Sequence, residues 1–183
     1  MSIKQNNPAT NDLLSRTVQL RLVEEDDAEF ILSLRLDERY NKFLSNVGDD
    51  LDGQRRWIRQ YKLDESKKEQ FYFIIERLDG SQCGTVRVYD FKDDSFSWGS
   101  WILNEKKTRY AAIESALLVY KFGFESLNFS NSHFEVIKEN TSVLSFHRKF
   151  GAKQISEDSS KIYFNLPLNI YLEKRKKFEK FTS

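Results

Sequence analysis

Cysteine, histidine, proline and methionine are all scarce in this 183-residue chain, which has one Cys, two His, two Pro and one Met. The single thiol, Cys83, excludes an internal disulfide framework and suits a reducing compartment, so we expect a cytoplasmic location. The histidines and the cysteine are too dispersed in the sequence to form a recognisable zinc motif. We therefore predict no metal site.

Long hydrophobic runs and an excess of one charge are also lacking. No apolar run approaches the roughly 18 residues that span a bilayer, and the polar first eleven residues do not resemble a signal peptide, so we expect no membrane partner. Lys and Arg number 29 against 28 Asp and Glu, and this net charge of +1 does not indicate nucleic acid. Hydrophobic residues at 39% suffice for one domain with one core.

Composition and hydrophobic periodicity divide the chain into three parts. Residues 1–14 are polar and predict a flexible leader, residues 15–168 form a single domain, and residues 169–183 form a basic tail. Alternating apolar positions predict strands at 17–23, 71–76, 84–91, 96–103, 132–137, 152–155 and 162–166. Helical periodicity and end signals predict helices at 24–35, 54–63, 110–127 and 141–150, with a short helix or a frayed end in the tail. This order predicts an α+β or α/β sheet with helices packed on its faces.

The junction of strand 96–103 with helix 110–127 is the first candidate site. Walker, GxGxxG and GxSxG signatures are absent, which argues against most kinases, dinucleotide-binding enzymes and hydrolases. A loop that leads into a helix presents unpaired N–H groups and the positive end of the helix dipole, which together bind phosphate. Lys106, Lys107 and Arg109 add positive charge there. An ordinary basic connection is the alternative.

The second candidate site is residues 138–151. Asn140 lies where an N-cap belongs, and its amide could equally contact a ligand. His147 shares a helical face with Val143 and Phe150, so we expect it to face inward. An inward histidine with a pKa near neutral is a candidate proton donor, and a hydrogen-bonded core histidine is the alternative.

Together these segments resemble the GNAT superfamily of acyl-CoA-dependent N-acyltransferases, over residues 17–166. Asn140, Lys149 and Gly151 match the spacing of the family's Asn-x-x-Ala/Ser…Lys-x-Gly stretch. The family's pyrophosphate loop, Gln/Arg-x-x-Gly-x-Gly/Ala, falls on residues 107–112, where Tyr110 replaces a glycine. The Rim-type ribosomal-protein and nucleotide-amino-sugar acetyltransferase branches are the nearest. The resemblance implies a mostly antiparallel, splayed mixed sheet of about seven strands with helices on both faces.

The resemblance also implies a donor site for acetyl-CoA, the acetyl-donor substrate, between strands 96–103 and 132–137. Asn140 and the backbone of Trp101, Ile102 and Leu103 would bind the pantetheine arm. Seven residues would surround the pyrophosphate: Lys107, Thr108, Arg109, Tyr110, Ala111, Ala112 and Ile113. His147 stands where the family often has a tyrosine that acts as general acid on the departing thiolate.

The acceptor would be a small molecule whose amine attacks the thioester directly. An alkyl ammonium has a pKa near 10, so a base must remove its proton. Asp90 is the first candidate base, followed by His133, Glu135 and Asp94, and each is alternatively a solvated or strand-face group. Aromatic residues beside arginines suit a nucleotide base and its diphosphate, and helix 54–63 carries Arg55, Arg56, Trp57 and Arg59. A surface helix whose Trp57 packs inward is the alternative.

These residues predict an acetyl-CoA-dependent N-acetyltransferase that acts on a small amine, preferably a nucleotide-linked amino sugar, in a ternary complex. A homodimer is one assembly that we consider. Three other functions stay open: a protein N-terminal acetyltransferase, a non-catalytic acyl-CoA-binding module, and an RNA-binding protein that uses residues 55–68 and the tail. Trp98 and Trp101 fall on opposite faces of their strand, so we expect at most one of them to line the cleft.

Overall fold

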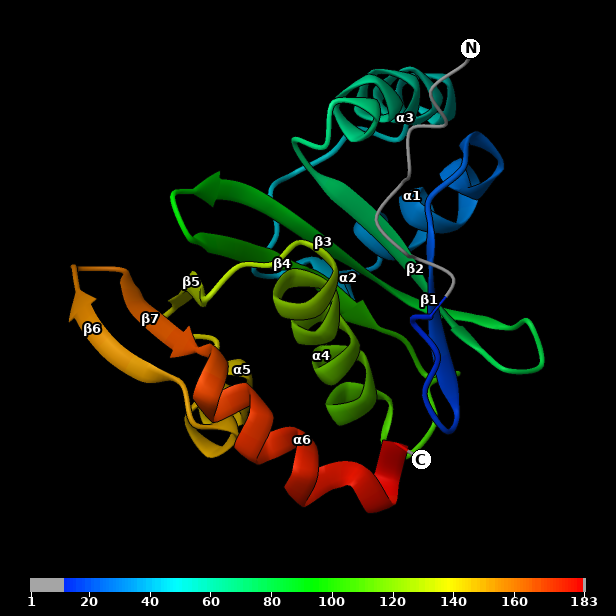
Figure 1. Ribbon diagram of the computed structural model, residues 1–183. Coiled ribbons are helices and arrows are strands. Elements are labelled where there is room, and N and C mark those ends of the chain that lie inside the picture. The colour runs from blue at the N-terminus through cyan, green and yellow to red at the C-terminus, as the bar shows by residue number, and fades with distance from the viewer. Residues whose placement is uncertain (1–11, 183) are drawn as a thin grey trace, which may run out of the picture.

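The computed structural model describes residues 12–182, and every predicted strand and helix is found there within a few residues (Figure 1). The strands are β1 (Val18–Leu22), β2 (Phe71–Arg77), β3 (Gln82–Lys92), β4 (Ser95–Leu103), β5 (Asn131–Ile137), β6 (Lys153–Glu157) and β7 (Lys161–Pro167). The helices are α1 (Ala28–Leu36), α2 (Glu38–Asn41), α3 (Leu51–Ser66), α4 (Ala111–Lys121), α5 (Thr141–Phe150) and α6 (Leu168–Thr182). A 3-10 turn, η1 (Glu25–Asp27), precedes α1, and a π-helical turn, η2 (Phe122–Ser126), extends α4. The short helix α2 was not predicted.

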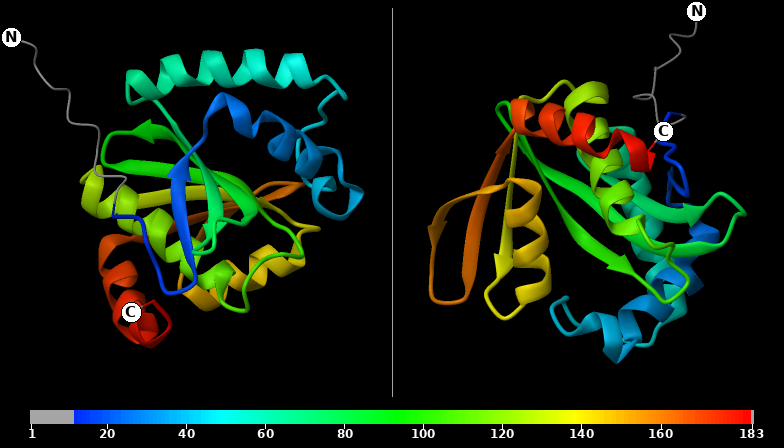
Figure 2. Two further views of the ribbon diagram at one scale, coloured as in Figure 1. Left: turned by 90° about the vertical axis from the view of Figure 1, so that its right-hand side faces the viewer. Right: turned by 90° about the horizontal axis from the view of Figure 1, so that it is seen from below.

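The strands form one mixed sheet in the order β1-β2-β3-β4-β5-β7-β6. Every neighbouring pair is antiparallel except β4 and β5, which run parallel and pair only at Ser95–Asn131 and Phe96–Ser132. Beyond these two pairs the strands diverge, which the right-hand view of Figure 2 shows as two separated halves of the sheet. The predicted splayed, seven-stranded α+β fold is confirmed.

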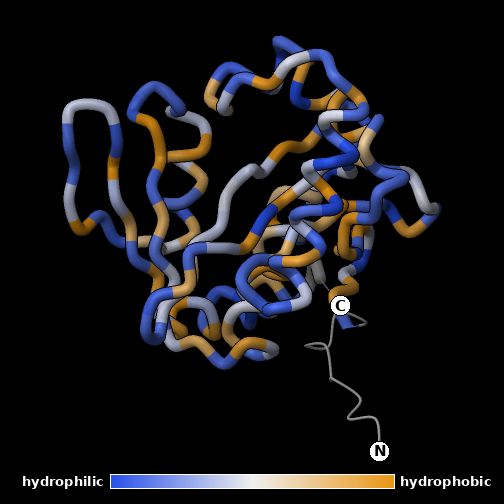
Figure 3. Tube along the Cα trace, turned by 90° about the horizontal axis from the view of Figure 1, so that it is seen from above, coloured by the Kyte–Doolittle hydropathy of each residue, from blue (hydrophilic) through white to orange (hydrophobic). Residues whose placement is uncertain are grey.

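Helices cover both faces of the sheet because its inner strands are apolar on both sides. On β2, Phe71 and Phe73 pack with Phe122 at the end of α4. The alternate residues Tyr72 and Ile74 belong to a second cluster with α1 and α3. Each fully buried side chain of this size stabilises the fold by roughly 1.5–3 kcal/mol. By contrast, the edge strand β6 is exposed along its whole length, and Figure 3 colours most of it hydrophilic.

The helix that we predicted over 110–127 is α-helical only to Lys121 and continues as the π turn η2. Gly123 lies in this turn directly against β4. A Cβ atom there would come within 2.1 Å of the Phe96 ring, so only glycine fits without movement of that ring. This contact holds the end of α4 against the point where β4 and β5 separate.

Both termini of the domain extend further than the sequence indicated. The predicted leader falls mostly on residues 1–11, outside the described part of the chain, but Leu13 is buried in the core and accepts a hydrogen bond from the Leu20 amide at 2.9 Å. The tail is helical and buries Tyr171. Among the residues described, no helix has the length and apolar character needed to cross a membrane.

Candidate active site

Strand β4 has a bulge at Ser100, next to the two hollows that form the candidate site. Gly99 pairs with Arg87 and Ile102 with Thr85, so two residues of β4 oppose one residue of β3. Ser100 adopts a left-handed φ of 48°, and its carbonyl accepts a hydrogen bond from Thr85 Oγ1 at 3.2 Å. Non-glycine residues are held in this conformation at a cost, and they cluster at functional sites.

The bulge also corrects the expectation for the two tryptophans of β4. Trp98 and Trp101 both line the cleft between β4 and β5, with ring centroids 5.3 Å apart. The extra residue reverses the alternation of side chains, so two positions three apart reach the same side. Glycine inside a strand pattern is a signal for such a bulge, and Gly99 precedes Ser100.

The splay cleft, as we call the hollow between the diverging parts of β4 and β5, has a volume of about 180 Å³. Its walls include Trp98, Ser100, Trp101, Phe134, Asn140 and His147. Asn140 is the N-cap of α5, as predicted, and its Oδ1 accepts a hydrogen bond from the Val143 amide at 3.4 Å. The cleft therefore combines apolar walls with two polar side chains from α5, which suits a thioester-bearing arm.

His147 faces inward, as predicted, and is only 4% exposed. Its ring centroid lies 4.3 Å from that of Phe134 and 5.3 Å from that of Trp98, and Nδ1 has no hydrogen-bond partner among the described residues. Burial lowers the pKa of the imidazole to about 3. The expected pKa near neutral is therefore wrong: the side chain is a neutral imidazole with one donor and one acceptor.

The predicted pyrophosphate loop, residues 107–113, leads into the first turn of α4. The Lys107 amide donates to the Asn104 carbonyl at 3.1 Å and the Ala111 amide to the Thr108 carbonyl at 3.2 Å, so the loop is tightly turned. The N-cap residue Tyr110 makes no side-chain cap hydrogen bond. Ala112 and Ile113 lie in the first turn, where backbone amides have no carbonyl acceptor within the helix. Their N–H groups form part of the positive end of the helix dipole.

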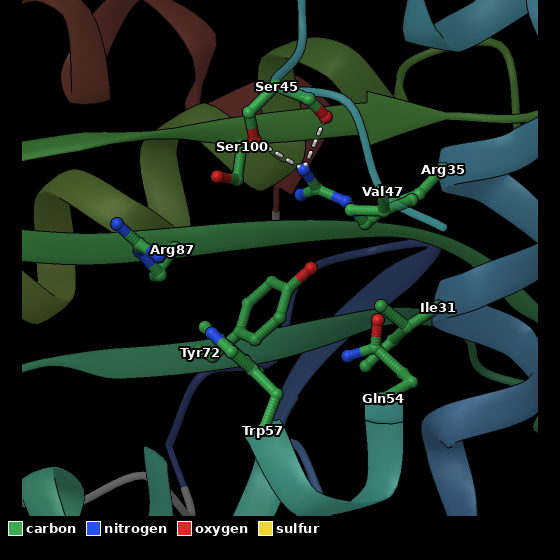
Figure 4. Close-up of a pocket in the computed structure, with 9 residues that line it drawn as sticks. All are labelled: Ile31, Arg35, Ser45, Val47, Gln54, Trp57, Tyr72, Arg87 and Ser100. Carbon is green, nitrogen blue, oxygen red and sulfur yellow. Dashed lines mark hydrogen bonds between the residues drawn. The ribbon is translucent and has the colours of Figure 1, made fainter. Parts of the chain in front are cut away.

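A second hollow of about 240 Å³, the arginine cavity, lies on the α1 and α3 side of the sheet (Figure 4). Nine residues line it: Ile31, Arg35, Ser45, Val47, Gln54, Trp57, Tyr72, Arg87 and Ser100. Ser100 also lines the splay cleft, so the bulge is the point where the two hollows meet.

Two arginines give this cavity its charge. Arg35 donates through Nη2 to the carbonyl and hydroxyl of Ser45, at 2.9 and 2.7 Å, and the Arg87 guanidinium lies 4.4 Å from the ring centroid of Tyr89. The Nε atom of each arginine is buried without a partner among the described residues. None of the nine lining residues carries a carboxylate, so the cavity favours an anion.

Sequence reasoning missed both arginines, although each has a signal. Arg87 interrupts the apolar strand between the buried residues Val86 and Val88, and Arg35 follows the buried Leu34 near the end of α1. A charged side chain inside an apolar run is unusual unless it has a partner or a role. What the sequence could not indicate is that a helix and a strand bring the two together.

The predicted acceptor residues separate into two groups. Trp57 lines the arginine cavity. Three surface ion pairs hold the other residues: Arg55 with Asp52 at 3.3 Å, Arg56 with Asp50 at 3.2 Å and Arg59 with Glu25 at 2.6 Å. None of these three arginines lines the arginine cavity or the splay cleft.

The candidate bases lie outside the arginine cavity. Asp90 Oδ2 is 2.8 Å from Lys92 Nζ and 3.1 Å from His133 Nε2, and the contacts with these two side chains, Lys92 first, hold the pKa of this carboxyl below its usual value. Glu135 reaches the wall of the splay cleft, where its carboxylate pairs with Lys161, and Asp94 accepts a hydrogen bond from Ser130. Over residues 12–182, no group of three His, Cys, Asp or Glu side chains could hold a metal ion.

Comparison with known proteins identifies the family. The family model of the acetyltransferase (GNAT) domain matches residues 17–153, so the chain belongs to the GNAT family and is an N-acetyltransferase. The apo structure of FdhC, described as a nucleotide-linked sugar GNAT, is 52% identical over 93% of this chain and 98% of its own, with a TM-score of 0.88. A search of curated proteins found no match.

Two more distant structures share the fold. Spermidine N-acetyltransferase from Vibrio cholerae, solved with CoA and spermine, is 15% identical over 85% of this chain and 98% of its own, with a TM-score of 0.73. Ribosomal-protein-S5-alanine acetyltransferase from Vibrio fischeri is 14% identical over 83% of this chain and 93% of its own, with a TM-score of 0.72. At this identity the likeness concerns the fold alone.

Proposed function

We propose that this chain transfers the acetyl group of acetyl-CoA to the primary amine of a nucleotide-linked amino sugar. The arginine cavity carries the proposal, because it meets the splay cleft at Ser100 and has two guanidinium groups but, among its described lining residues, no carboxylate. An acceptor that enters there needs an anionic group near its amine. A polyamine is cationic throughout and would be repelled. The relative that is 52% identical and described as a nucleotide-linked sugar GNAT supports the same class.

The donor side also fits the proposal. The splay cleft offers apolar walls and the side chains of Asn140 and His147, whose buried Nδ1 lacks a partner among the described residues. The first turn of α4 offers uncapped amides for a pyrophosphate. Trp101, Ile102 and Leu103 follow Ser100 in β4, and their backbone is the predicted partner of the pantetheine arm. Acetyl-CoA, when bound, supplies an activated acyl thioester.

In the proposed reaction the amine nitrogen attacks the thioester carbonyl carbon at the Ser100 junction, and the C–S bond breaks. The amine loses a proton to water, since no described side chain of the arginine cavity is a carboxylate or an imidazole, and in the splay cleft Glu135 is paired with Lys161 and His147 is a very weak base. A backbone N–H near Leu103 is the predicted donor to the developing oxyanion. The thiolate of CoA, whose pKa is near 8.5, leaves along the splay cleft. His147 is neutral there and stabilises the thiolate as a hydrogen-bond donor rather than as an acid.

The release of CoA thiol by the full chain, measured with several acceptors, tests the proposal. We expect turnover with UDP- or TDP-linked amino sugars, and rates near the background hydrolysis of acetyl-CoA with spermidine and with an N-terminal peptide. Turnover of spermidine or of the peptide, without turnover of a nucleotide-linked amino sugar, would overturn the proposal. The peptide result would instead support a protein N-terminal acetyltransferase.

A further inference from the structure

We infer that the acceptor binds in one direction, with its amine at Ser100, its diphosphate between Arg35 and Arg87, and its nucleobase stacked on Trp57 in a third hollow. This inference rests on the proposed function and adds an assignment of each part of the acceptor to particular residues. Three features of the described residues carry it: the order of the hollows, their charge and the exposure of Trp57.

The three hollows lie in series. The outer hollow, of about 290 Å³, is lined by Leu32, Val47, Gly48, Asp50, Gly53, Gln54 and Trp57. It shares Val47, Gln54 and Trp57 with the arginine cavity, which in turn shares Ser100 with the splay cleft. The arginine cavity is therefore in the middle. A nucleotide-linked amino sugar has the same order, because its diphosphate separates the sugar from the base.

Positive charge is concentrated in the middle hollow. Figure 4 shows Arg35 and Arg87 on two sides of the cavity, one from α1 and one from β3. The guanidinium fork matches phosphate oxygens, and the buried Nε of each arginine still needs an acceptor. Burial raises the pKa of the Tyr72 phenol between them, while Thr85 and both guanidinium groups act in the opposite direction. Tyr72 is therefore a neutral hydroxyl that can contact the same phosphates.

The outer hollow has the character of a nucleobase site. Trp57 is held from behind by a stacking contact with Tyr61 at 5.9 Å, yet 40% of its surface is exposed. A fixed and exposed aromatic ring is a stacking platform. The one carboxylate in this hollow, Asp50, accepts a hydrogen bond from the Gly53 amide at 2.9 Å and pairs with Arg56 at 3.2 Å, so its charge is balanced. A neutral ring fits this environment better than a phosphate does.

Gln54 is placed to read the edge of that base. It lines both the arginine cavity and the outer hollow, one turn before Trp57 on the same helix. Its amide offers one acceptor and two donor hydrogens. The imide edge of uracil or thymine presents the complementary groups.

Calorimetric titration of the full chain tests the assignment, with CoA at saturation so that the donor phosphate site is filled. The ligands are UDP, TDP and inorganic pyrophosphate. We expect Trp57→Ala to raise the Kd for UDP and for TDP by about 10-fold or more and to leave the Kd for pyrophosphate unchanged, because only the base is stacked. Arg87→Gln should raise the Kd for all three ligands by about 10-fold or more, because it removes a charged contact to phosphate.

Two matched variants control for changes elsewhere. Leu63→Ala removes another exposed apolar side chain from α3, and Arg77→Gln removes an arginine from β2 that pairs with Asp79 at 2.7 Å outside the three hollows. We expect both controls to bind UDP as the unmodified chain does. Circular dichroism and the unfolding midpoint of each variant establish that it is folded.

The outcomes separate this inference from the proposed function. If the chain acetylates a nucleotide-linked amino sugar but Trp57→Ala and Arg87→Gln bind UDP and TDP normally, the assignment is wrong and the function stands. The assignment also fails if Trp57→Ala weakens the binding of pyrophosphate as much as that of UDP, since the substitution would then disturb the arginine cavity as well as the base site. If the unmodified chain neither binds these nucleotides nor acetylates the sugar, both proposals are overturned.

Discussion

Replacement of His147 by phenylalanine tests how strongly the core suppresses the charge of this imidazole. Burial lowers the pKa from its ordinary value of 6.5 to about 3 in the folded chain. Because the unfolded chain binds the proton first, the free energy of unfolding must fall as the pH drops below about 6.5. At pH 5 the difference of roughly 1.5 pH units corresponds to about 2 kcal/mol. His147→Phe keeps an aromatic ring beside Phe134 and Trp98 and removes the titration.

Urea unfolding of both proteins at pH 7.5 and pH 5 measures this quantity. Between pH 7.5 and pH 5 we expect the free energy of unfolding to fall by about 2 kcal/mol more in the unmodified chain than in His147→Phe. Any change in packing cancels, because it contributes equally at both pH values, and so do the other titrating groups. Equal losses in the two proteins would refute the argument, since the imidazole would then be able to protonate in the folded state.

The lowered pKa of His147 also determines how this side chain can act in catalysis. At pH 7 only about one folded molecule in ten thousand carries the imidazolium, so general acid catalysis by this group is negligible. A neutral donor to the thiolate contributes about 1.5–3 kcal/mol. We therefore expect His147→Phe to lower kcat at least about 10-fold and to leave the shape of the kcat profile between pH 6 and pH 9 unchanged. Loss of an ionisation from that profile would instead identify a general acid.

Three further variants test other parts of the structure. Gly123→Ala should lower the free energy of unfolding by about 1–3 kcal/mol, because its Cβ would lie 2.1 Å from the Phe96 ring; an unchanged thermal midpoint would contradict the close contact. Asp27→Asn should destabilise the fold by about 2 kcal/mol, because Arg21 donates to both oxygens of this buried carboxylate at 2.7 and 2.8 Å; urea unfolding that matches the unmodified chain would contradict it. Asp90→Asn should lower kcat/KM by less than about 3-fold, because Lys92 and His133 depress the pKa of a carboxyl that lies outside the arginine cavity; a loss of about 100-fold, which general base catalysis supplies, would identify Asp90 as the base.

The fold could be predicted from the sequence because its elements have clear periods. Strand 71–76 and helix 141–150 were found almost to the residue, and Gly151 ends α5 with a left-handed φ of 107°. The one described helix that was missed, α2, has four residues and buries none of them, so it leaves no periodic pattern. The π turn at 122–126 was also invisible, because it continues the apolar stripe of α4.

The site was harder to predict because its members come from separate elements. Asn140 caps α5 and His147 lies on it, so local signals were enough: the N-cap position for Asn140, and for His147 its spacing to Val143 and Phe150. Arg35 and Arg87 are joined only by the packing of α1 on β3, which no local pattern records. Arg55 and Arg56 were predicted to bind the acceptor because they lie beside Trp57 in the sequence, yet ion pairs with Asp52 and Asp50 neutralise them. The bulge at Ser100 changes which strand residues face the cleft, and alternation alone could not show it.

The most direct test of the account is a competition in one vessel, followed by mass spectrometry of the products. The full chain is incubated with acetyl-CoA and an equimolar mixture of a TDP-linked amino sugar, a UDP-linked amino sugar, spermidine and an N-terminal peptide. We expect a nucleotide-linked amino sugar to gain one acetyl group on its nitrogen while spermidine and the peptide stay unmodified. Acetylation of spermidine or the peptide ahead of both sugar nucleotides would contradict it.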